Sequence, residues 1–161
     1  MEKKTMAGLI AIVAVVAVVI SAGALYTEEK PPASAATQDP EFLKWASETS
    51  AHIIGDNGLL LEALKSLDFD DMEFYAGILY DDAKKALDEI DQFSVSPKLQ
   101  PFKDEYKLSL DDTKWYAYFT EQGARNIDPD AIETATEYAE SSAEHLERAN
   151  RYLRSYLKKI K

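Results

Sequence analysis

Apolar and small residues recur at alternating spacings of three and four through residues 41–161. This spacing places them on one face of an α-helix, which must be buried against a partner. Four such segments follow one another, and none shows the apolar alternation of a β-strand, so the sequence predicts an all-α class. The expected inward positions are Leu43, Ala46, Ser50, Ile53, Asn57, Leu60, Leu64 and Leu67; Phe69, Met72, Ala76, Leu79, Ala83, Ala86, Ile90 and Phe93; Leu99, Phe102, Tyr106, Leu110, Thr113, Ala117, Thr120 and Ala124; and Ile132, Ala135, Ala139, Ser142, Leu146, Ala149, Leu153, Tyr156 and Ile160.

Helix starts are marked by local signals. A capping residue precedes Pro at the pairs Asp39-Pro40, Ser96-Pro97 and Asp128-Pro129, which predicts a helix beginning at each Pro. The remaining start falls near residue 68, where Asp70 and Glu73 have the spacing of a capping box.

The connections between these segments are short, about two, three and four residues in chain order, and short connections make neighbouring helices antiparallel. The prediction is an up-down-up-down antiparallel four-helix bundle over residues 41–161, preceded by one N-terminal transmembrane helix. The tetrapeptide Gly55-Asp56-Asn57-Gly58 reads alone as a turn. The apolar phase continues unbroken across it, which favours one long helix with a weak or kinked point.

Residues 6–26 form an uncharged, apolar run of 21 residues, about the length that spans a bilayer. Lys3 and Lys4 before it place the N-terminus in the cytoplasm and the later residues outside. We therefore expect a single-pass cell-membrane protein whose membrane contact is residues 6–26. The small residues before Leu25 also fit a signal-peptidase site, so cleavage after Ala24 would make the protein secreted. Residues 27–40, rich in Pro, Ala and Ser, are predicted to be a spacer.

The composition of the chain argues against several kinds of functional site. The chain has no Cys, which excludes disulfides and thiolate sites, and its net charge of −11 argues against a nucleic-acid partner. His52 and His145 lack the Glu-x-x-His spacing of a di-iron bundle and are expected at boundary or surface positions. Asn126, Asp128 and Asp130 imitate a calcium loop without its central Gly. We expect no cofactor, no metal, no catalytic residue and no enzymatic activity.

Three groups of residues are candidates for binding. Aromatic residues exceed what one core stripe can hold, and Tyr75, Tyr80, Trp115 and Tyr118 form a candidate interaction face. A candidate ligand cavity between the helices would be lined by Tyr106, Thr113, Tyr116 and Thr120. A candidate membrane-proximal basic tip, able to meet anionic lipid head groups, consists of Arg151, Arg154, Lys158 and Lys159.

The stretches SVSPKLQPFKDEYKLSLDD and GARNIDPDAIETATEYAESSAEHLERA lie within residues 94–157. In these stretches the chain resembles uncharacterised archaeal, methanogen-like, membrane-anchored helical-bundle surface proteins. The resemblance implies an exported helical domain on a cell surface and carries no known active site.

Two functional hypotheses follow. The first is a non-enzymatic, tethered extracytoplasmic bundle that binds a protein partner or envelope component, or serves a structural role. The second is a bundle that binds a small molecule, as a sensor domain does. Against the second, no further membrane segment follows the bundle in this sequence to carry a signal back. The sequence leaves the identity of the partner and the oligomeric state undetermined.

Overall fold

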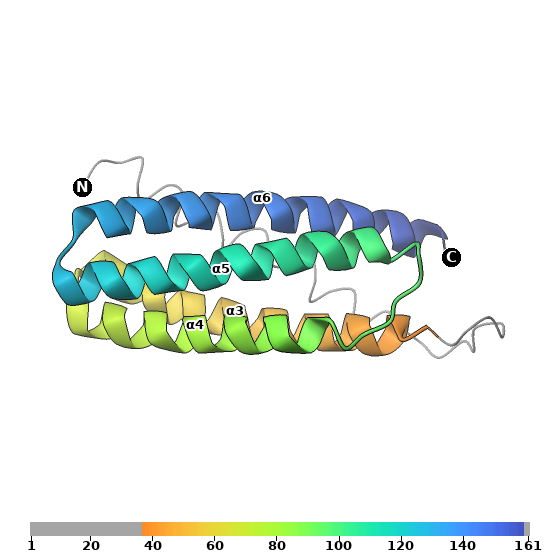
Figure 1. Ribbon diagram of the computed structural model, residues 1–161, viewed down its shortest axis with the longest axis horizontal. Coiled ribbons are helices and arrows are strands. Elements are labelled where there is room, and N and C mark those ends of the chain that lie inside the picture. The colour runs from red at the N-terminus through yellow and green to blue at the C-terminus, as the bar shows by residue number, and fades with distance from the viewer. Residues whose placement is uncertain (1–36, 160–161) are drawn as a thin grey trace.

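A computed structural model describes residues 37–159. This part of the chain folds into four helices and no strand: α3 (Asp39–Ser66), α4 (Phe69–Ile90), α5 (Gln100–Asn126) and α6 (Pro129–Lys159). Each helix runs antiparallel to its neighbour in the sequence (Figure 1). Within the described residues no helix is long and apolar enough to cross a membrane. The predicted transmembrane helix at residues 6–26 lies outside the described residues, as does nearly all of the spacer.

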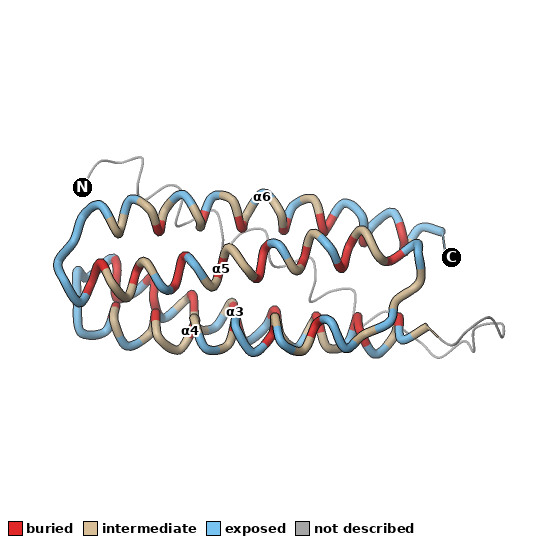
Figure 2. Tube along the Cα trace, in the orientation of Figure 1, coloured by how far each residue is buried: buried red, intermediate tan, exposed pale blue. Residues whose placement is uncertain are grey.

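The core consists of the residues that the three-four spacing predicts to face inward. Figure 2 shows the buried positions recurring along the inner side of each helix. The stripe that runs from Leu99, just before α5, to Ala124 is buried at all eight predicted positions. Leu67 and Phe69, at one end of the bundle, are exposed, and Phe93, in the connection at the other end, is only half-buried. The largest fully buried apolar side chains are Phe42, Leu60, Leu79, Ile90, Leu99, Phe102, Tyr116 and Leu153.

α3 continues through Gly55-Asp56-Asn57-Gly58, which confirms one long helix in place of a turn. Gly costs roughly 1 kcal/mol against Ala in a helix interior, so this segment is a locally weak part of α3. Asn57 is nevertheless buried at the place that the inward stripe assigns to it. Burial of the stripe on both sides of the glycines therefore outweighs their low helix propensity.

Two of the predicted helix starts are wrong. α3 begins at Asp39, with Gln38 at the N-cap and no side-chain cap, and α5 begins at Gln100, after a turn at residues 97–99. The α4–α5 connection is therefore nine residues, 91–99, and longer than predicted. At the start of α3, the Asp39 carboxylate accepts the Ser96 backbone N–H at 2.6 Å instead of capping its own helix.

The starts of α4 and α6 lie closer to the positions predicted from the sequence. Asp128 caps α6 by accepting the Asp130 and Ala131 backbone N–H groups at 3.0 and 3.4 Å. α4 is capped by Asp68, which accepts the Asp71 N–H at 3.1 Å, so the cap lies two residues before the predicted Asp70.

The start of α3 is tied to the far end of the chain. Asp39 is buried, and its second carboxylate oxygen accepts a hydrogen bond from the Tyr156 hydroxyl of α6 at 2.9 Å. Gln38 and Ser94 exchange hydrogen bonds of 2.8 Å. The α3 start, the α4–α5 connection and the end of α6 thus form one end of the bundle, which we call the basal end.

The opposite end, which we call the tip, consists of two turns of the same design. Leu67 and Ile127 each follow a helix in the left-handed conformation, with φ of 55° and 51°. The next residue in each turn, Asp68 or Asp128, donates its N–H back to Ala63 or Gly123 and caps the following helix. Gly or Asn usually occupies the left-handed position, where an ordinary side chain costs roughly 1–2 kcal/mol.

α5 and α6 approach each other closely because their facing residues are small. Ser109, Thr113 and Ser142 form a buried hydrogen-bonded cluster, with hydroxyl distances of 2.8 and 3.0 Å. Farther along, Gly123 packs against α6, and a Cβ added there would lie 2.5 Å from Ile132 Cδ1 and 3.2 Å from the Asp128 carbonyl oxygen.

The glycines provide a matched test of this packing. Gly123→Ala should lower the free energy of unfolding by about 1–3 kcal/mol, because the added methyl overlaps Ile132. Gly55→Ala meets nothing within 4 Å and should raise it by about 1 kcal/mol through helix propensity. Urea unfolding of both variants measures the difference. A stabilised Gly123→Ala would show that α5 and α6 do not approach this closely.

Candidate functional site

The candidate site is an aromatic cluster on the outer side of α5, which we call the aromatic face. It comprises Tyr80 of α4, Trp115, Tyr118 and Phe119 of α5, and Tyr138 of α6. Ring centroids connect them in a continuous series: Tyr80–Tyr118 at 6.3 Å, Trp115–Tyr118 at 5.8 Å, Trp115–Phe119 at 6.2 Å and Phe119–Tyr138 at 5.6 Å. The aromatic face therefore spans three helices.

Trp115 and Tyr118 are the most exposed members of the aromatic face, with 37% and 36% of their surface accessible. The pair Phe119 and Tyr138 joins α5 to α6, and its rings stack at an interplanar angle of 9°. The Lys114 ammonium lies 4.7 Å from the Trp115 ring centroid and adds a cation–π contact.

Three of the four residues predicted for the interaction face come together in this cluster. Tyr75 stands apart and packs edge-on against Phe74, with centroids 5.3 Å apart. The sequence prediction missed Phe119 and Tyr138 as members. The signal for Phe119 was its spacing of four from Trp115, which places both on one side of a helix. Tyr138 gave no such signal, because its neighbours are on another helix.

The residues predicted to line a ligand cavity, Tyr106, Thr113, Tyr116 and Thr120, are all buried in the core. Three of their hydroxyls have protein partners. Tyr106 lies 2.8 Å from the Ser50 hydroxyl, Thr113 donates to the Ser109 carbonyl at 2.8 Å, and Thr120 donates to the Tyr116 carbonyl at 2.8 Å.

Tyr116 differs from Tyr106, because its buried hydroxyl has no hydrogen-bond partner among the described residues. Burial raises the pKa of both phenols far above the usual value, so both stay protonated. A buried hydroxyl without a partner costs about 1–3 kcal/mol. A water or ligand bound beside the Tyr116 hydroxyl would remove this cost.

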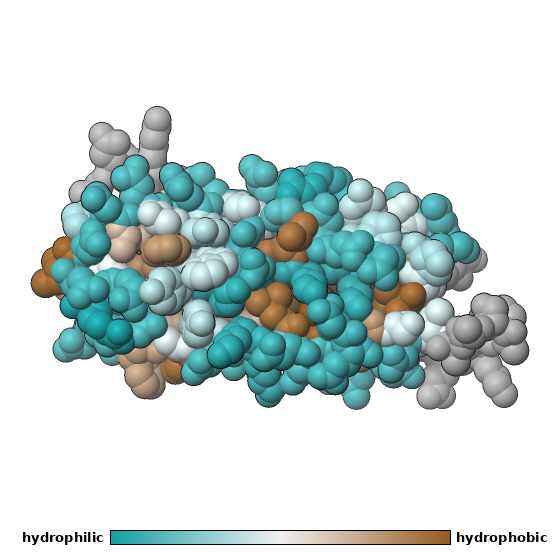
Figure 3. All heavy atoms as spheres, in the orientation of Figure 1, coloured by the Kyte–Doolittle hydropathy of each residue, from teal (hydrophilic) through white to brown (hydrophobic). Residues whose placement is uncertain are grey.

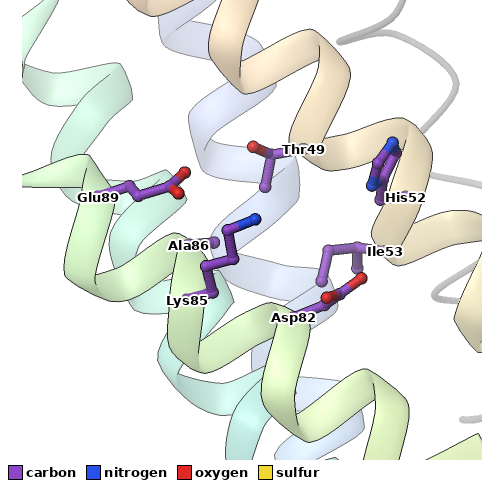
Figure 4. Close-up of a pocket in the computed structure, with 7 residues that line it drawn as sticks. All are labelled: Thr49, His52, Ile53, Asp82, Lys85, Ala86 and Glu89. Carbon is purple, nitrogen blue, oxygen red and sulfur yellow. The ribbon is translucent and has the colours of Figure 1, made fainter.

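A small hollow of about 60 Å³ lies between α3 and α4, away from the four core residues. Figure 4 shows Thr49 and His52 of α3 facing Asp82, Lys85 and Glu89 of α4 around it. Glu89 accepts a hydrogen bond from the Trp45 indole at 2.8 Å. The hollow has room for a few water molecules and is lined mostly by polar groups.

Asp56 adjoins this hollow and carries a perturbed carboxyl group. Partial burial raises its pKa, and the neighbouring Asp82 carboxyl, which can share its proton and repels its charge, raises it further. His52 acts in the opposite direction, and the resulting pKa is about 6, against an ordinary value of 3.8.

A second polar cluster joins α5 to α6. The Glu105 carboxylate lies 2.7 Å from His145 Nδ1 and accepts a hydrogen bond from Arg148 Nε at 3.0 Å. Burial opposes the charge on Glu105, but the bonds from His145 and Arg148 outweigh it and hold its pKa below the usual range. Asp112 lies 3.9 Å from the other nitrogen of His145. Over residues 37–159 no group of three His, Asp or Glu is arranged to hold a metal ion.

The four basic residues predicted to be membrane-proximal, Arg151, Arg154, Lys158 and Lys159, are exposed at the end of α6. The hydrogen bond from Tyr156 to Asp39 places them at the basal end, beside the start of α3. Arg151 pairs with Glu147 at 2.5 Å. The other three make no ion pair with a described residue.

Comparisons of the chain with protein-family models, curated proteins and solved structures find no match. The resemblance to archaeal surface proteins therefore stays a prediction.

The two buried tyrosines make a matched pair for testing the core. Tyr106→Phe should lower the free energy of unfolding by about 1 kcal/mol, because Ser50 loses its partner, whereas Tyr116→Phe should raise it by about 1 kcal/mol. Urea unfolding at neutral pH measures both. A loss of stability in Tyr116→Phe would instead show that its hydroxyl has a partner inside the bundle.

The neighbouring carboxyl groups of Asp56 and Asp82 predict that the stability of the fold depends on pH. The pKa of Asp56 is higher in the folded protein than in the unfolded chain. The contribution of the protonated Asp56 carboxyl group to the free energy of unfolding is therefore fully present below pH 3.8 and is lost as the pH rises through about 6. Asp56→Asn should therefore raise the melting temperature at pH 8 by about 3 °C and change it little at pH 4. Asp81→Asn, on the exposed side of α4, is the control. Equal effects of Asp56→Asn at both pH values would contradict the assignment.

Proposed function

We propose that this protein is a non-enzymatic helical bundle that binds a protein partner or envelope component through its aromatic face. The observation that carries the proposal is the continuous series of five aromatic rings across α4, α5 and α6, with Trp115 and Tyr118 at its most exposed part. Tyr and Trp are enriched among the residues that dominate protein–protein binding energy. They offer a large rigid contact area and lose little conformational entropy.

The polar surroundings support a protein partner over a nucleic acid. The net charge of −11 opposes phosphate binding. Lys114 holds its ammonium over the Trp115 ring and contributes a charged group beside an apolar one. A mixture of aromatic centre and charged border is typical of interfaces that form and dissociate.

We further propose that the bundle is tethered to a membrane by residues 6–26 and lies on the extracytoplasmic side. Their apolar length supports this location, and the basal end, from which the chain leads back to those residues, also carries the cationic end of α6. N-terminal sequencing of the mature protein distinguishes the tether from a secreted form. A mature chain that begins at Leu25 would contradict the tether.

One observation favours the second candidate function, the binding of a small molecule. The Tyr116 hydroxyl is buried without a partner in the described residues, and the Asn57 side-chain oxygen is in the same condition. A polar ligand or an ordered water between the helices would satisfy such groups. The tyrosine pair above addresses this candidate without involving the aromatic face.

The aromatic face can be tested with a double variant. Trp115→Ala with Tyr118→Ala should reduce capture of the partner by about tenfold or more, since truncating central aromatic anchors weakens an interface strongly. The measurement is quantitative cross-linking of the tagged full-length protein in its source membranes. Tyr152→Ala removes an exposed aromatic residue of α6 outside the aromatic face and should leave capture unchanged. Undiminished capture by the folded double variant would contradict the proposal.

A further inference from the structure

The tip of the bundle exposes large apolar side chains at both of its turns. Leu67 and Ile127 are 56% and 71% exposed, and Phe69 and Phe74 in the first turns of α4 are also exposed. Arg125 Nε donates to Glu73 at 2.9 Å, so the end of α5 lies against the start of α4 and joins the two turns into one surface. Figure 3 shows hydrophobic atoms at this end of the molecule.

The conformation of the two turn residues makes this exposure unusual. A left-handed backbone is unfavourable for Leu and more so for the β-branched Ile, and Gly or Asn would relieve it. Burial does not compensate, because both side chains point largely into solvent. Gly or Asn at positions 67 and 127 would therefore make the folded state more stable than Leu and Ile do.

Carboxylates surround these apolar side chains. Residues 65–74 carry four acids and one base, and so do residues 121–133. The two bases are already paired, Lys65 with Glu62 and Arg125 with Glu73. Four exposed carboxylates make no ion pair with a described residue: Asp70, Asp71, Asp130 and Glu133.

We propose that the tip is a docking surface for a cationic amphipathic polypeptide segment, with Leu67 and Ile127 as its apolar contacts. The charge of the surface selects this occupant. Unpaired carboxylates repel nucleic acid and anionic lipid, and they attract Lys and Arg side chains. The exposed apolar residues within the acidic border require an apolar face on the partner. This surface is separate from the aromatic face, because Ile127 lies roughly 13 Å along the chain direction from Tyr118.

The test uses the full-length protein in nanodiscs of neutral lipid. The probe is an 18-residue helical peptide of Leu and Lys, with Leu along one face, and its matched control carries Glu in place of Lys. The Lys peptide should bind at least tenfold more tightly than the Glu peptide. Leu67→Asn combined with Ile127→Asn should weaken its binding at least tenfold and raise the melting temperature, since Asn tolerates the left-handed conformation. Ile127→Gly should act in the same direction.

Controls separate specific docking from general attraction between opposite charges. Leu108→Asn replaces an exposed apolar residue on α5 with ordinary helical geometry and should leave binding unchanged. The triple variant Asp70→Asn, Asp71→Asn and Asp130→Asn keeps both capping aspartates and should weaken binding at least tenfold.

Three results would overturn the proposal. The first is unchanged binding of the Lys peptide to the folded Leu67→Asn, Ile127→Asn variant, which would leave only charge attraction. The second is equal binding of the Lys and Glu peptides. The third is self-association of the protein in the absence of peptide, if the Leu67→Asn, Ile127→Asn variant abolishes it. The occupant of the tip would then be a second copy of this chain.

Discussion

A buried hydroxyl cluster between α5 and α6 fixes how these two helices pack against each other. Ser109, Thr113 and Ser142 bring the two helices together through a cluster in which each hydroxyl has a partner. Satisfied polar groups of this kind fix one register between helices, whereas an apolar seam would permit sliding. Nearer the surface, the half-buried Phe119 and Tyr138 stack across the same pair of helices. The aromatic face thus continues a contact that begins in the interior.

Much of the architecture followed from periodicity, because a three-four pattern is a direct record of which helix face is buried. The pattern predicted even the polar positions Ser50, Asn57 and Ser142 as inward-facing, and all three are buried. Helix starts were less predictable. Asp39 has the residue type of a cap and precedes Pro40, yet it bonds to Ser96, 57 residues away. No local signal distinguishes a carboxylate that caps its own helix from one that satisfies a distant loop.

The candidate site was predictable in part: the sequence named Tyr80, Trp115 and Tyr118, but it included Tyr75 and missed Phe119 and Tyr138. Trp115 and Tyr118 share a side of α5 through their spacing, so the sequence places them together. Tyr80 and Tyr138 join them only because α4 and α6 flank α5 in the bundle. The carboxyl group of Asp56 is similar, since its pKa depends on Asp82 across the α3–α4 seam. Contacts between helices are set by rotation and register, which a single sequence does not specify.

The ties at the basal end determine how the bundle would respond to force. A pull on the chain at residue 37 would reach the start of α3, where Gln38 is bonded to Ser94, and Asp39 to Ser96 and Tyr156. The tension would be shared at once among α3, the α4–α5 connection and α6. α3 would then resist peeling, because several hydrogen bonds must break together before its first turn can separate. An arrangement of this kind suits a domain that is held at one end while its surroundings move.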